Sequence, residues 1–357
     1  MKVLAWVPYP LGIAPGQRYR IEQWSPYLRD LGIDVTFAPF ATPALSQALY
    51  TPGHWAAKAA GMTTALAKRF AEALQARKYD AVFLQREGSL IGPAWSERLL
   101  KARQPAIVYD FDDAIYLPYV SPTNRYLSYL KFPWKTRALC RMAAAVVAGN
   151  EHLAEFASRY NDRVHVVPST VSLREYRERP APPPGRVPVV GWTGSHSSAQ
   201  YLSLVREPLQ ELRRRRAFRV LIIGIEHFEI PGVEVECRPW SAETEVRDLW
   251  DMDVGIMPLP DEPWARGKCG MKAIQYMGVG LPAVVSPVGA NREIVVDGVT
   301  GFHAANAAEW VDTLDRLLGE EALRQRLGTA AREGVRVRYS AESQAPRIAA
   351  ILRQVTS

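Results

Sequence analysis

With 357 residues, the chain is too long for one ordinary hydrophobic core and suits about two domains. Its hydrophobic content of 48% and charged content of 23% are those of a soluble globular protein. The formal net charge of +7 comes largely from arginine, including a run at positions 213–216. Such a charge suits anionic partners, namely nucleotides, phospholipid surfaces or nucleic acid, although a solvated helix face is the favoured interpretation of the run itself.

The cysteine and apolar patterns exclude two further classes of protein. Cys140, Cys237 and Cys269 are too few and too scattered for a disulfide framework or a metal site, so a reducing cytoplasm fits best. No apolar run approaches the roughly 18 to 20 residues that span a bilayer. The N-terminus resembles a signal peptide, but Pro8 and Pro10 cut its apolar run short, which favours a first buried strand.

The first half of the chain has the rhythm of a parallel α/β sheet. Residues 2–7 predict a strand, 8–16 a Pro/Gly loop, 18–31 a helix ended by Gly32, and 33–37 a second strand. The loop lacks the GxGxxG spacing of dinucleotide-binding folds. A helix over 55–78 and strands over 79–84, 106–109, 143–147 and 164–167 follow. Each strand ends in polar residues, and we expect these to gather at one edge of the sheet.

A proline-rich segment divides the chain. Residues 179–188 contain five prolines in ten positions and predict a semi-rigid linker. The βα alternation then restarts, with strands over 189–192, 219–223, 233–237, 254–257 and 283–285, and helices from about 199 and over 272–277, 307–319 and 341–355. We therefore predict an N-terminal domain over 1–178, the linker over 179–188, a C-terminal domain over 189–338, and a helical segment over 339–357 that packs back on the N-terminal domain.

The stretch 266–289 carries the clearest chemical signal. It predicts a loop, a short helix, a tight turn and a buried strand. Before the helix lie three cations, with small residues between them that let a ligand approach the backbone: Arg266, Lys268 and Lys272, with Gly267 and Gly270. This pattern favours phosphate binding. An ordinary loop with solvated basic residues is the alternative.

Together these features resemble the GT-B glycosyltransferases of group 1, the family called GT4. The resemblance is sharpest from Val254 to Phe302, and more loosely it covers the whole chain. The matching segments are Met257-Pro258, QYMGVGLPAV at 275–284, Val288-Gly289, REIV at 292–295 and DGVTG at 297–301. Residues 164–176 also look like the segment that closes the family's N-terminal domain.

The resemblance implies an architecture and an activity. Two Rossmann-like, doubly wound parallel-sheet domains would face each other across a cleft, the C-terminal one holding a nucleotide-diphosphate-sugar and the N-terminal one a saccharide or lipid-linked acceptor. Family members need no metal or other cofactor, so protein cations would stabilise the leaving diphosphate. Most members retain the anomeric configuration. We therefore expect a role in cell-surface glycan synthesis, in the cytoplasm or peripherally at the inner face of the membrane.

Three departures from the family pattern concern the donor site. The family's E-x7-E pair would fall on Gly267 and Gln275, so both carboxylates are missing. An amide at Gln275 can still accept a hydrogen bond from the ribose, but it brings no charge. The family's G-R…K pair would fall near Gly194-Ser195, so its arginine is lost too. Lys272 matches the K-x-x-E-Y-M variants of the family, and we infer that the diphosphate cations have moved to this loop.

On the donor side, Lys272 and Lys268 are the first choices for stabilising the leaving group. A salt bridge to Asp261 or Glu262 is their structural alternative. The loop after strand 189–192 offers amides and hydroxyls for the same phosphates, through Gly194, Ser195, His196 and Ser197. Ser195 is equally well explained as a helix N-cap, His196 as a plain loop residue, and Trp240 either as a stacking partner for the base or as core.

On the acceptor side, Asp112 and Asp113 follow a buried strand. In an inverting enzyme either would be the base that deprotonates the acceptor, and in a retaining enzyme it would orient the sugar. Hydrogen bonds to loop amides are the alternative, and we expect no metal there. Four further candidates for binding an acceptor or its phosphate are Gly16, Arg18, Arg20 and Arg86. The basic and aromatic segment 131–141 suits either an anionic membrane surface or a solvated helix face.

Two other classes of function compete with a transferase. Nucleotide-sugar epimerases share the architecture, but this chain does not follow their motif. A non-catalytic nucleotide-sugar-binding protein is the second alternative, since the Glu pair is missing. Nucleic acid is not an expected partner, because the basic residues are spread along the chain without a recognised motif.

Overall fold

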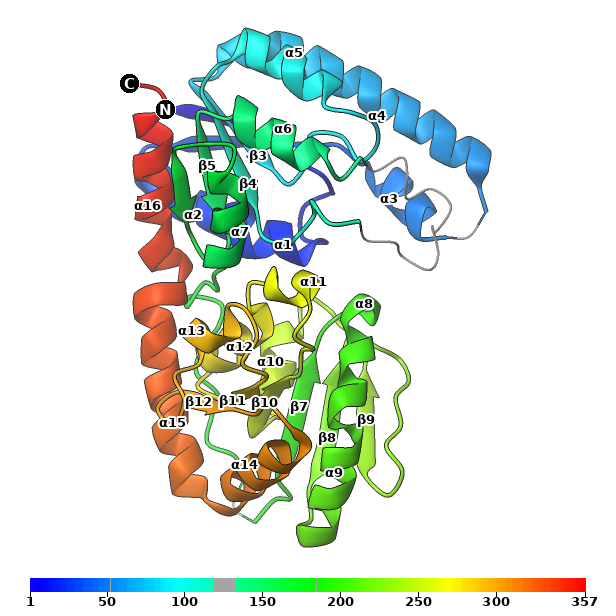
Figure 1. The fold of residues 1–357 in the computed structure, drawn as a ribbon, viewed down its shortest axis with the longest axis vertical. Coiled ribbons are helices and arrows are strands. Elements are labelled where there is room, and N and C mark those ends of the chain that lie inside the picture. The colour runs from blue at the N-terminus through cyan, green and yellow to red at the C-terminus, as the bar shows by residue number, and fades with distance from the viewer. Residues whose placement is uncertain (52, 119–131, 184) are drawn as a thin grey trace. The chain divides into compact units, whose positions relative to one another are not determined.

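The computed structural model describes residues 1–51, 53–118, 132–183 and 185–357, which form two compact units (Figure 1). Unit 1 comprises Met1–Ser169 together with Gln344–Ser357, and unit 2 comprises Thr170–Ser343. Lys131, which begins the basic and aromatic segment, and Pro184, within the proline-rich segment, lie outside the described residues. Each unit has its own parallel sheet.

In the part of the chain that the structure describes, the sheet of unit 1 has six parallel strands in the order β2-β1-β3-β4-β5-β6. Apolar runs such as AVFL in β3 form central strands that are buried on both faces. The edge strand β2 alternates instead between exposed and half-buried residues over most of its length. The strands are β1 (Lys2–Val7), β2 (Asp34–Pro39), β3 (Ala81–Gln85), β4 (Ile107–Phe111), β5 (Ala145–Ala148) and β6 (Val164–Val166).

The helices of unit 1 pack apolar side chains on this sheet. Trp24, for example, meets Phe83 of β3 edge to face, with ring centroids 6.3 Å apart. At the C-terminus, Arg347 donates to Val166 O (2.9 Å) and Arg353 to Leu31 O (2.7 Å), which ties the last helix to unit 1. The helices are α1 (Pro15–Gln17), α2 (Gln23–Asp30), α3 (Pro43–Tyr50), α4 (Trp55–Gln75), α5 (Trp95–Arg103), α6 (Lys135–Met142), α7 (Glu151–Ser158) and, from Gln344 onward, α16 (Ala341–Gln354).

Within its described residues, unit 2 also has a sheet of six parallel strands, in the order β12-β11-β10-β7-β8-β9. The strand order reverses between β7 and β10, which is the doubly wound Rossmann pattern. The strands are β7 (Val189–Thr193), β8 (Arg219–Ile223), β9 (Glu234–Arg238), β10 (Val254–Met257), β11 (Ala283–Val285) and β12 (Gly301–His303).

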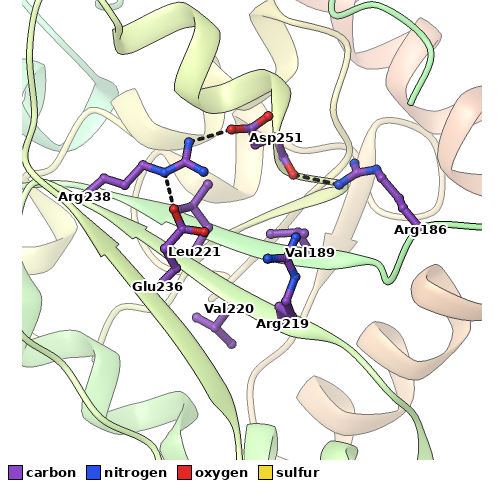
Figure 2. Close-up of a pocket in the computed structure, with 8 residues that line it drawn as sticks. All are labelled: Arg186, Val189, Arg219, Val220, Leu221, Glu236, Arg238 and Asp251. Atoms are coloured by element: carbon purple, nitrogen blue, oxygen red, sulfur yellow. Dashed lines mark hydrogen bonds and ion pairs between the residues drawn. The ribbon is translucent and has the colours of Figure 1, made fainter. Parts of the chain in front are cut away.

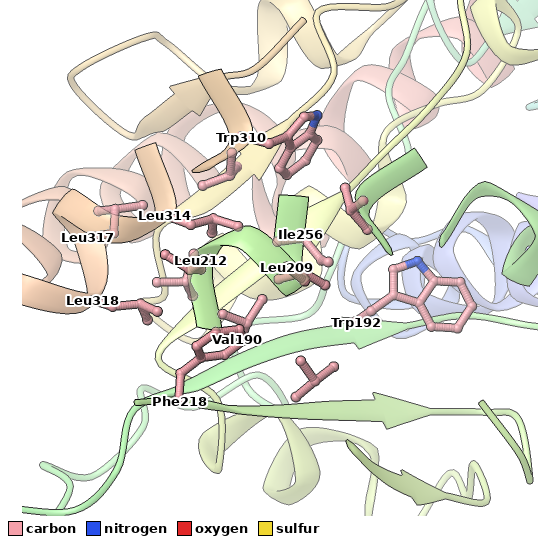
Figure 3. Packing of buried hydrophobic residues seen from close by; sticks show 14 of the residues in the cluster. Val190, Trp192, Leu209, Leu212, Phe218, Ile256, Trp310, Leu314, Leu317 and Leu318 are labelled. Carbon is pink, nitrogen blue, oxygen red and sulfur yellow. The ribbon is translucent and has the colours of Figure 1, made fainter. Parts of the chain in front are cut away.

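One face of this sheet is covered by α9 and α14. Leu209 and Leu212 of α9 and Trp310 and Leu314 of α14 pack over Val190 and its neighbours on the sheet (Figure 3). The helices of unit 2 are α8 (His196–Ala199), α9 (Ser203–Arg215), α10 (Glu245–Trp250), α11 (Pro263–Arg266), α12 (Met271–Gly278), α13 (Asn291–Ile294), α14 (Ala307–Gly319), α15 (Glu321–Gly334) and the start of α16.

Helix α12 packs on the opposite face of the same sheet. A side chain on Gly255 of β10 would collide with the ring of Tyr276, so the glycine makes room for that ring. The Tyr276 hydroxyl accepts from the backbone N of Thr193 (2.9 Å) and donates to Ile256 O (3.2 Å). These contacts join α12 to β7 and β10, the two strands at which the order of the sheet reverses.

Most of the predicted elements are confirmed, and the differences have physical causes. The strands at 2–7, 219–223, 254–257 and 283–285 match the prediction. The predicted helix over 18–31 is interrupted by a π-type turn, Arg18–Glu22, where the Arg20 side chain turns into the core. Helix α15 was not predicted, because Gly328 interrupts its apolar pattern.

The division between the units falls at Ser169/Thr170, so the proline-rich segment 179–188 lies within unit 2. Residues just before that segment pack on unit 2, because their backbone groups find hydrogen-bond partners there. Val171 pairs with Ser340, Arg177 O accepts from Trp250 Nε1 (3.1 Å), and Arg179 N donates to Val279 O (3.0 Å).

A search for membrane-spanning helices among the described residues found none of sufficient length and apolar character to cross a bilayer.

Gly224→Ala tests how the loop after β7 is held. Gly224 has φ +100°, and a side chain there would collide with Gly194 O. Gly232 also has a positive φ, +78°, but faces open space. We expect Gly232→Ala to lower the unfolding free energy by about 1 kcal/mol and Gly224→Ala by about 3 kcal/mol, measured by urea denaturation followed by circular dichroism. Equal losses in the two variants would contradict the proposed collision.

Candidate functional site

In unit 2, the loops that follow β7 and β10 lie at the point where the strand order reverses. In open α/β sheets, ligands bind at the carboxyl ends of the strands beside such a point. The loop after β7 contains Gly194 to Ser198, and the loops after β10 lead through α11 to α12. This position brings together the two segments that the sequence assigns to phosphate binding.

Lys272 connects the two segments. Its Nζ lies 3.4 Å from Ser198 Oγ and 5.3 Å from the centroid of the Trp192 ring. A side chain on Gly194 would come within 2.8 Å of Lys272 Cε, so the lysine stem lies against the loop. The carboxylates named as its alternative partners have other contacts: Asp261 is bound by Arg266, and Glu262 accepts from the Tyr201 hydroxyl. A cation and the loop after β7 therefore converge on one place.

The loop after β7 is ordered by its own hydroxyl groups. Ser195 is the N-cap of α8 and forms a capping box with Ser198. Its Oγ also lies 2.9 Å from Ser197 Oγ. His196 is exposed on the first turn of α8. Ser195 is thus the N-cap of α8, and its exposed neighbours His196 and Ser197 are accessible to a ligand.

The other basic residues differ in exposure and contacts. Arg266 is half exposed and paired with Asp261 at 2.7 Å, and this hydrogen bond raises the pKa of Arg266. Lys268 lies over the ring of Trp264, with Nζ 5.8 Å from its centroid. Gly267 ends α11 in the ordinary right-handed helical conformation. Gly270 has φ +63°, and a side chain there would collide with Ile294, so this position requires glycine. The structure thus assigns a packing reason to Gly270.

Gln275 belongs to a buried polar network that the sequence did not reveal. Its Nε2 donates to Tyr176 Oη (3.0 Å) and to Glu245 Oε1 (3.2 Å), and Trp240 Nε1 donates to the same Glu245 oxygen (3.0 Å). Gln275, Glu245 and Tyr176 are almost fully buried, whereas Trp240 is 36% exposed. Trp240 and Gln275 were predicted site residues, whereas Glu245 and Tyr176 were not, although Glu245 lies only five residues after Trp240.

A hollow elsewhere in unit 2 is lined by both cations and carboxylates (Figure 2). It encloses about 170 Å³ beside the first residues of β7 and β8. Arg238 lies 2.5 Å from both Glu236 and Asp251, and Arg186 donates to the backbone oxygen of Asp251 (3.1 Å). Its cations are thus matched by carboxylates and backbone oxygens of the protein, which makes it a weaker candidate for an anion than the loop after β7.

In unit 1, a comparable polar cluster lies where the strand order reverses between β1 and β3. A side chain on Gly16 would collide with Asp112 Oδ2, so this glycine allows the loop after β1 to approach the carboxylate after β4. Buried Gln85 donates to Gly16 O (3.2 Å), and Arg86 lies 3.6 Å from Asp112. Asp113 is half-buried, and its Oδ1 accepts from Ala114 N (3.1 Å).

Arg86 is held in a strained conformation at the end of β3. Its φ of 61° is in the left-handed region that non-glycine residues rarely adopt. Two contacts hold it there: its N donates to Asp110 O (2.7 Å), and its O accepts from the Tyr109 hydroxyl (2.9 Å). Burial lowers the pKa of the Arg86 guanidinium, but the carboxylates of Asp112 and Asp113 outweigh this effect, so the pKa is raised and the charge is retained.

Arg20 and Arg18 occupy different environments. The Arg20 side chain is fully buried: it binds Asp110 at 2.5 Å, donates to Val167 O (2.9 Å) and stacks on Trp24. The expectation that Arg20 contacts an acceptor or its phosphate is therefore wrong, because Arg20 is buried and its charge is balanced by the buried carboxylate of Asp110. Arg18 is half-buried and lies over the Tyr19 ring, and it remains a candidate.

Across the described residues, no group of three or more His, Cys, Asp or Glu side chains is arranged to hold a metal ion.

Comparison with solved structures identifies the fold. The chain is similar to sucrose-phosphate synthase from Thermosynechococcus elongatus, with a TM-score of 0.73 and 15% identity over 99% of both chains. It is also similar to HepE from Anabaena, solved with UDP and glucose, with a TM-score of 0.71 and 16% identity over 99% of this chain and 100% of that one. The fold is the GT-B architecture, as predicted.

The sequence comparisons match part of the chain to a glycosyltransferase family. Residues 187–320 match the family model described as "Glycosyl transferases group 1", which confirms the resemblance stated from the sequence. A D-inositol 3-phosphate glycosyltransferase of Nocardia farcinica is 28% identical over 220 residues, 54% of this chain and 48% of that protein. One from Frankia alni is 41% identical over 64 residues, 17% and 16% of the two chains. The chain thus spans about half or less of the length of these relatives.

Arg20→Met tests the buried ion pair of unit 1. Removing Arg20 leaves the buried carboxylate of Asp110 without its cation. We therefore expect the unfolding free energy of Arg20→Met to be about 3–5 kcal/mol lower than that of the wild type. Burial raises the pKa of Asp110, and without Arg20 that effect is unopposed by its main cation. Because the folded-state pKa then exceeds the unfolded one, the loss should be largest at high pH and shrink as the pH falls through the raised pKa of Asp110.

The double variant Arg20→Met/Asp110→Leu is the matched control. It removes both charges, so it should recover most of the stability and show no such pH dependence. A single variant as stable as the wild type in urea denaturation would contradict the structural role of Arg20.

Proposed function

We propose that the chain is a GT4-type glycosyltransferase that moves a sugar from a nucleotide-diphosphate-sugar to an acceptor. The observation that carries the proposal is the convergence of Lys272 on the Gly194–Ser198 loop at the strand-order reversal of unit 2. Two further supports are the family match over residues 187–320 and the UDP-sugar held by a protein of the same fold, HepE. These observations support unit 2 as the donor-binding unit.

The chemistry asked of this site is stabilisation of a departing diphosphate. Negative charge accumulates on the leaving oxygen, and preorganised cations and amides in a water-poor site lower the barrier. Lys272, half-buried against Trp192, is placed for this role, with Lys268 on the same loop. Because both cations belong to the protein, we propose that no metal is required, and that EDTA leaves turnover unchanged.

Unit 1 is proposed to bind the acceptor through Asp112, Arg86 and Gly16. Asp112 lies next to a glycine backbone and an arginine that retains its charge. Such a pairing suits an acceptor that carries hydroxyl groups near a phosphate, as a lipid-linked saccharide does. We propose a role in cell-surface glycan synthesis at the inner face of the membrane, with retention of configuration. The anomeric signal of the product in NMR spectra distinguishes retention from inversion.

Nucleotide binding without transfer is the second candidate function, favoured by the absence of both E-x7-E carboxylates at Gly267 and Gln275. Release of nucleoside diphosphate from its sugar would decide between the two.

Lys272→Ala tests the donor site. A thermal-shift screen against UDP, GDP, ADP and CDP and their sugars should show one nucleotide that raises the melting temperature of the wild type with concentration. A hydrogen bond to a charged group is worth about 1.5–3 kcal/mol. Lys272→Ala should therefore bind that nucleotide roughly 10- to 100-fold more weakly than the wild type, as measured by calorimetry.

Arg214→Ala is the matched control, because it removes an equally charged side chain from the exposed surface of α9. It should bind the nucleotide as the wild type does. The absence of a thermal shift with all four nucleotides would overturn the proposed function. Binding of the nucleotide by Lys272→Ala with wild-type affinity would show that Lys272 does not contact the diphosphate.

Asp112→Asn tests the acceptor side. Loss of a base or of an orienting carboxylate costs on the order of 10² or more in rate, so release of nucleoside diphosphate from the sugar donor should fall at least that far. Donor affinity should stay within about twofold of the wild type, since Asp112 belongs to unit 1. Asp162→Asn, an exposed carboxylate of the same unit, serves as the control. Unchanged turnover in Asp112→Asn would exclude it as a catalytic residue.

A further inference from the structure

Helices α5 and α6 of unit 1 each start at a largely exposed tryptophan. Trp95, the first residue of α5, is 63% exposed, and Trp134, the residue before α6, is 52% exposed. An indole ring is mostly apolar and carries one N–H donor, so it is best placed at a boundary between water and an apolar phase. Two such rings at two helix starts therefore indicate a surface with a partner.

The two helix starts are held next to each other. Lys135, which follows Trp134, is buried, and its Nζ lies 3.6 Å from the carboxylate of Glu97, two residues after Trp95. The same Nζ donates to Ser89 O (2.6 Å). Figure 1 shows α5 and α6 beside each other in unit 1. These contacts place the two tryptophans on one part of the surface.

The exposed faces of both helices are basic. Each tryptophan is followed three residues later by an exposed arginine, Arg98 on α5 and Arg137 on α6, and residues three apart share a helix face. Arg103 and Arg141 are exposed as well. Within these two helices, all of whose residues the structure describes, Glu97 is the only acidic residue, and it is buried. The exposed cations are therefore not balanced by a carboxylate of either helix.

An anionic lipid bilayer has the chemistry that such a surface recognises. Tryptophan rings concentrate at the head-group level of membranes, and each Lys or Arg near anionic lipids strengthens binding by roughly fivefold. A solvated helix face, by contrast, usually carries charges of both signs and does not expose two indole rings side by side.

We propose that the exposed faces of α5 and α6 lie on an anionic lipid bilayer. Trp95 and Trp134 enter the head-group layer, and the exposed arginines of the two helices bind lipid phosphates. Because the rings and the cations come from the same two helix faces, one orientation of unit 1 brings all of them to the membrane.

This orientation also concerns the proposed acceptor. Glu87 Oε2, in the residue after Arg86, lies 3.8 Å from Lys135 Nζ at the start of α6. The membrane surface thus begins close to the edge of the sheet at which Arg86 and Asp112 lie. A lipid-linked acceptor in the bilayer would present its head group to this edge. For the acceptor, the inference rests on the proposed function, whereas the contact with lipid is tested without it.

Co-sedimentation with lipid vesicles tests the role of the arginines. The wild type should bind vesicles of phosphatidylcholine and phosphatidylglycerol, and this binding should weaken as the salt concentration rises. Arg98→Gln/Arg137→Gln should bind these vesicles roughly 25-fold more weakly, about fivefold for each charge removed. Arg213→Gln/Arg214→Gln removes the same net charge from the exposed surface of α9 in unit 2 and should bind as the wild type does.

Fluorescence quenching by brominated lipids tests the insertion of the tryptophans. The fluorescence of the wild type, which has ten tryptophans, should fall on binding to vesicles that contain these lipids. Trp95→Phe/Trp134→Phe should still bind the vesicles, because phenylalanine keeps the apolar ring, but it should lose most of the quenching. Trp240→Phe removes an exposed indole of unit 2 and should keep the quenching.

The outcomes separate this inference from the proposed function. Absence of binding to the phosphatidylglycerol vesicles, equal losses in the two arginine double variants, or full quenching in Trp95→Phe/Trp134→Phe would overturn the membrane surface and leave the transferase standing. Vesicle binding as proposed, without a thermal shift by any of the four nucleotides, would overturn the proposed function and leave the membrane surface. Circular dichroism checks that each variant is folded.

Discussion

The arrangement of unit 2 depends on the way α12 is locked to its sheet. Gly255 leaves a space in β10 that the Tyr276 ring fills, and the Tyr276 hydroxyl bonds to backbone groups of both β7 and β10. Burial raises the pKa of this hydroxyl, so it keeps its proton and its ability to donate. The residues one and four positions earlier on the helix, Gln275 and Lys272, are consequently placed at the strand-order reversal. The packing of Tyr276 on the sheet thus fixes the positions of two candidate site residues, Gln275 and Lys272.

Unit 1 uses buried charge for a similar purpose. The Arg20–Asp110 pair joins the segment after β1 to the end of β4, and the backbone oxygen of Asp110 in turn holds Arg86 in its left-handed conformation. A buried ion pair adds little net stability compared with an apolar pair, but breaking it is costly. Its effect is to fix the positions of three loops at the edge of the sheet. Asp112 and Gly16, which lie on two of these loops, are held close together as a result.

The fold was largely predictable because its signals are local. Apolar runs bounded by Gly, Pro and polar residues predicted β1, β8, β10 and β11. Closely spaced cations and glycines marked the candidate phosphate-binding loop. Helix α15 was not predicted because Gly328 resembles a helix break. In the folded chain that glycine lets Gly280 O approach closely, a reason that only the neighbouring segment supplies.

The site was less predictable because its contacts are distant in sequence. Arg20 was expected at the surface, since an arginine after a strand resembles a ligand-binding residue, and its partner Asp110 lies 90 residues away. Glu245 meets Gln275 across 30 residues, and only the packing of α10 against α12 brings them together. Sequence patterns show which residue types are present, whereas the pairing of buried charges depends on which elements become neighbours.

The missing E-x7-E carboxylates follow from the same electrostatic reasoning. Two unit charges 4 Å apart interact by about 4 kcal/mol at the effective dielectric typical of a protein surface, so a carboxylate beside a diphosphate bound as proposed would oppose its binding. This chain has glycine at 267 and an amide at 275, and it keeps Lys268 and Lys272 beside them. The carboxylate of Glu245 accepts from Gln275 on the α10 side, whereas Lys272 reaches the loop after β7. The cations of the proposed phosphate site are thus kept apart from the buried Glu245 carboxylate.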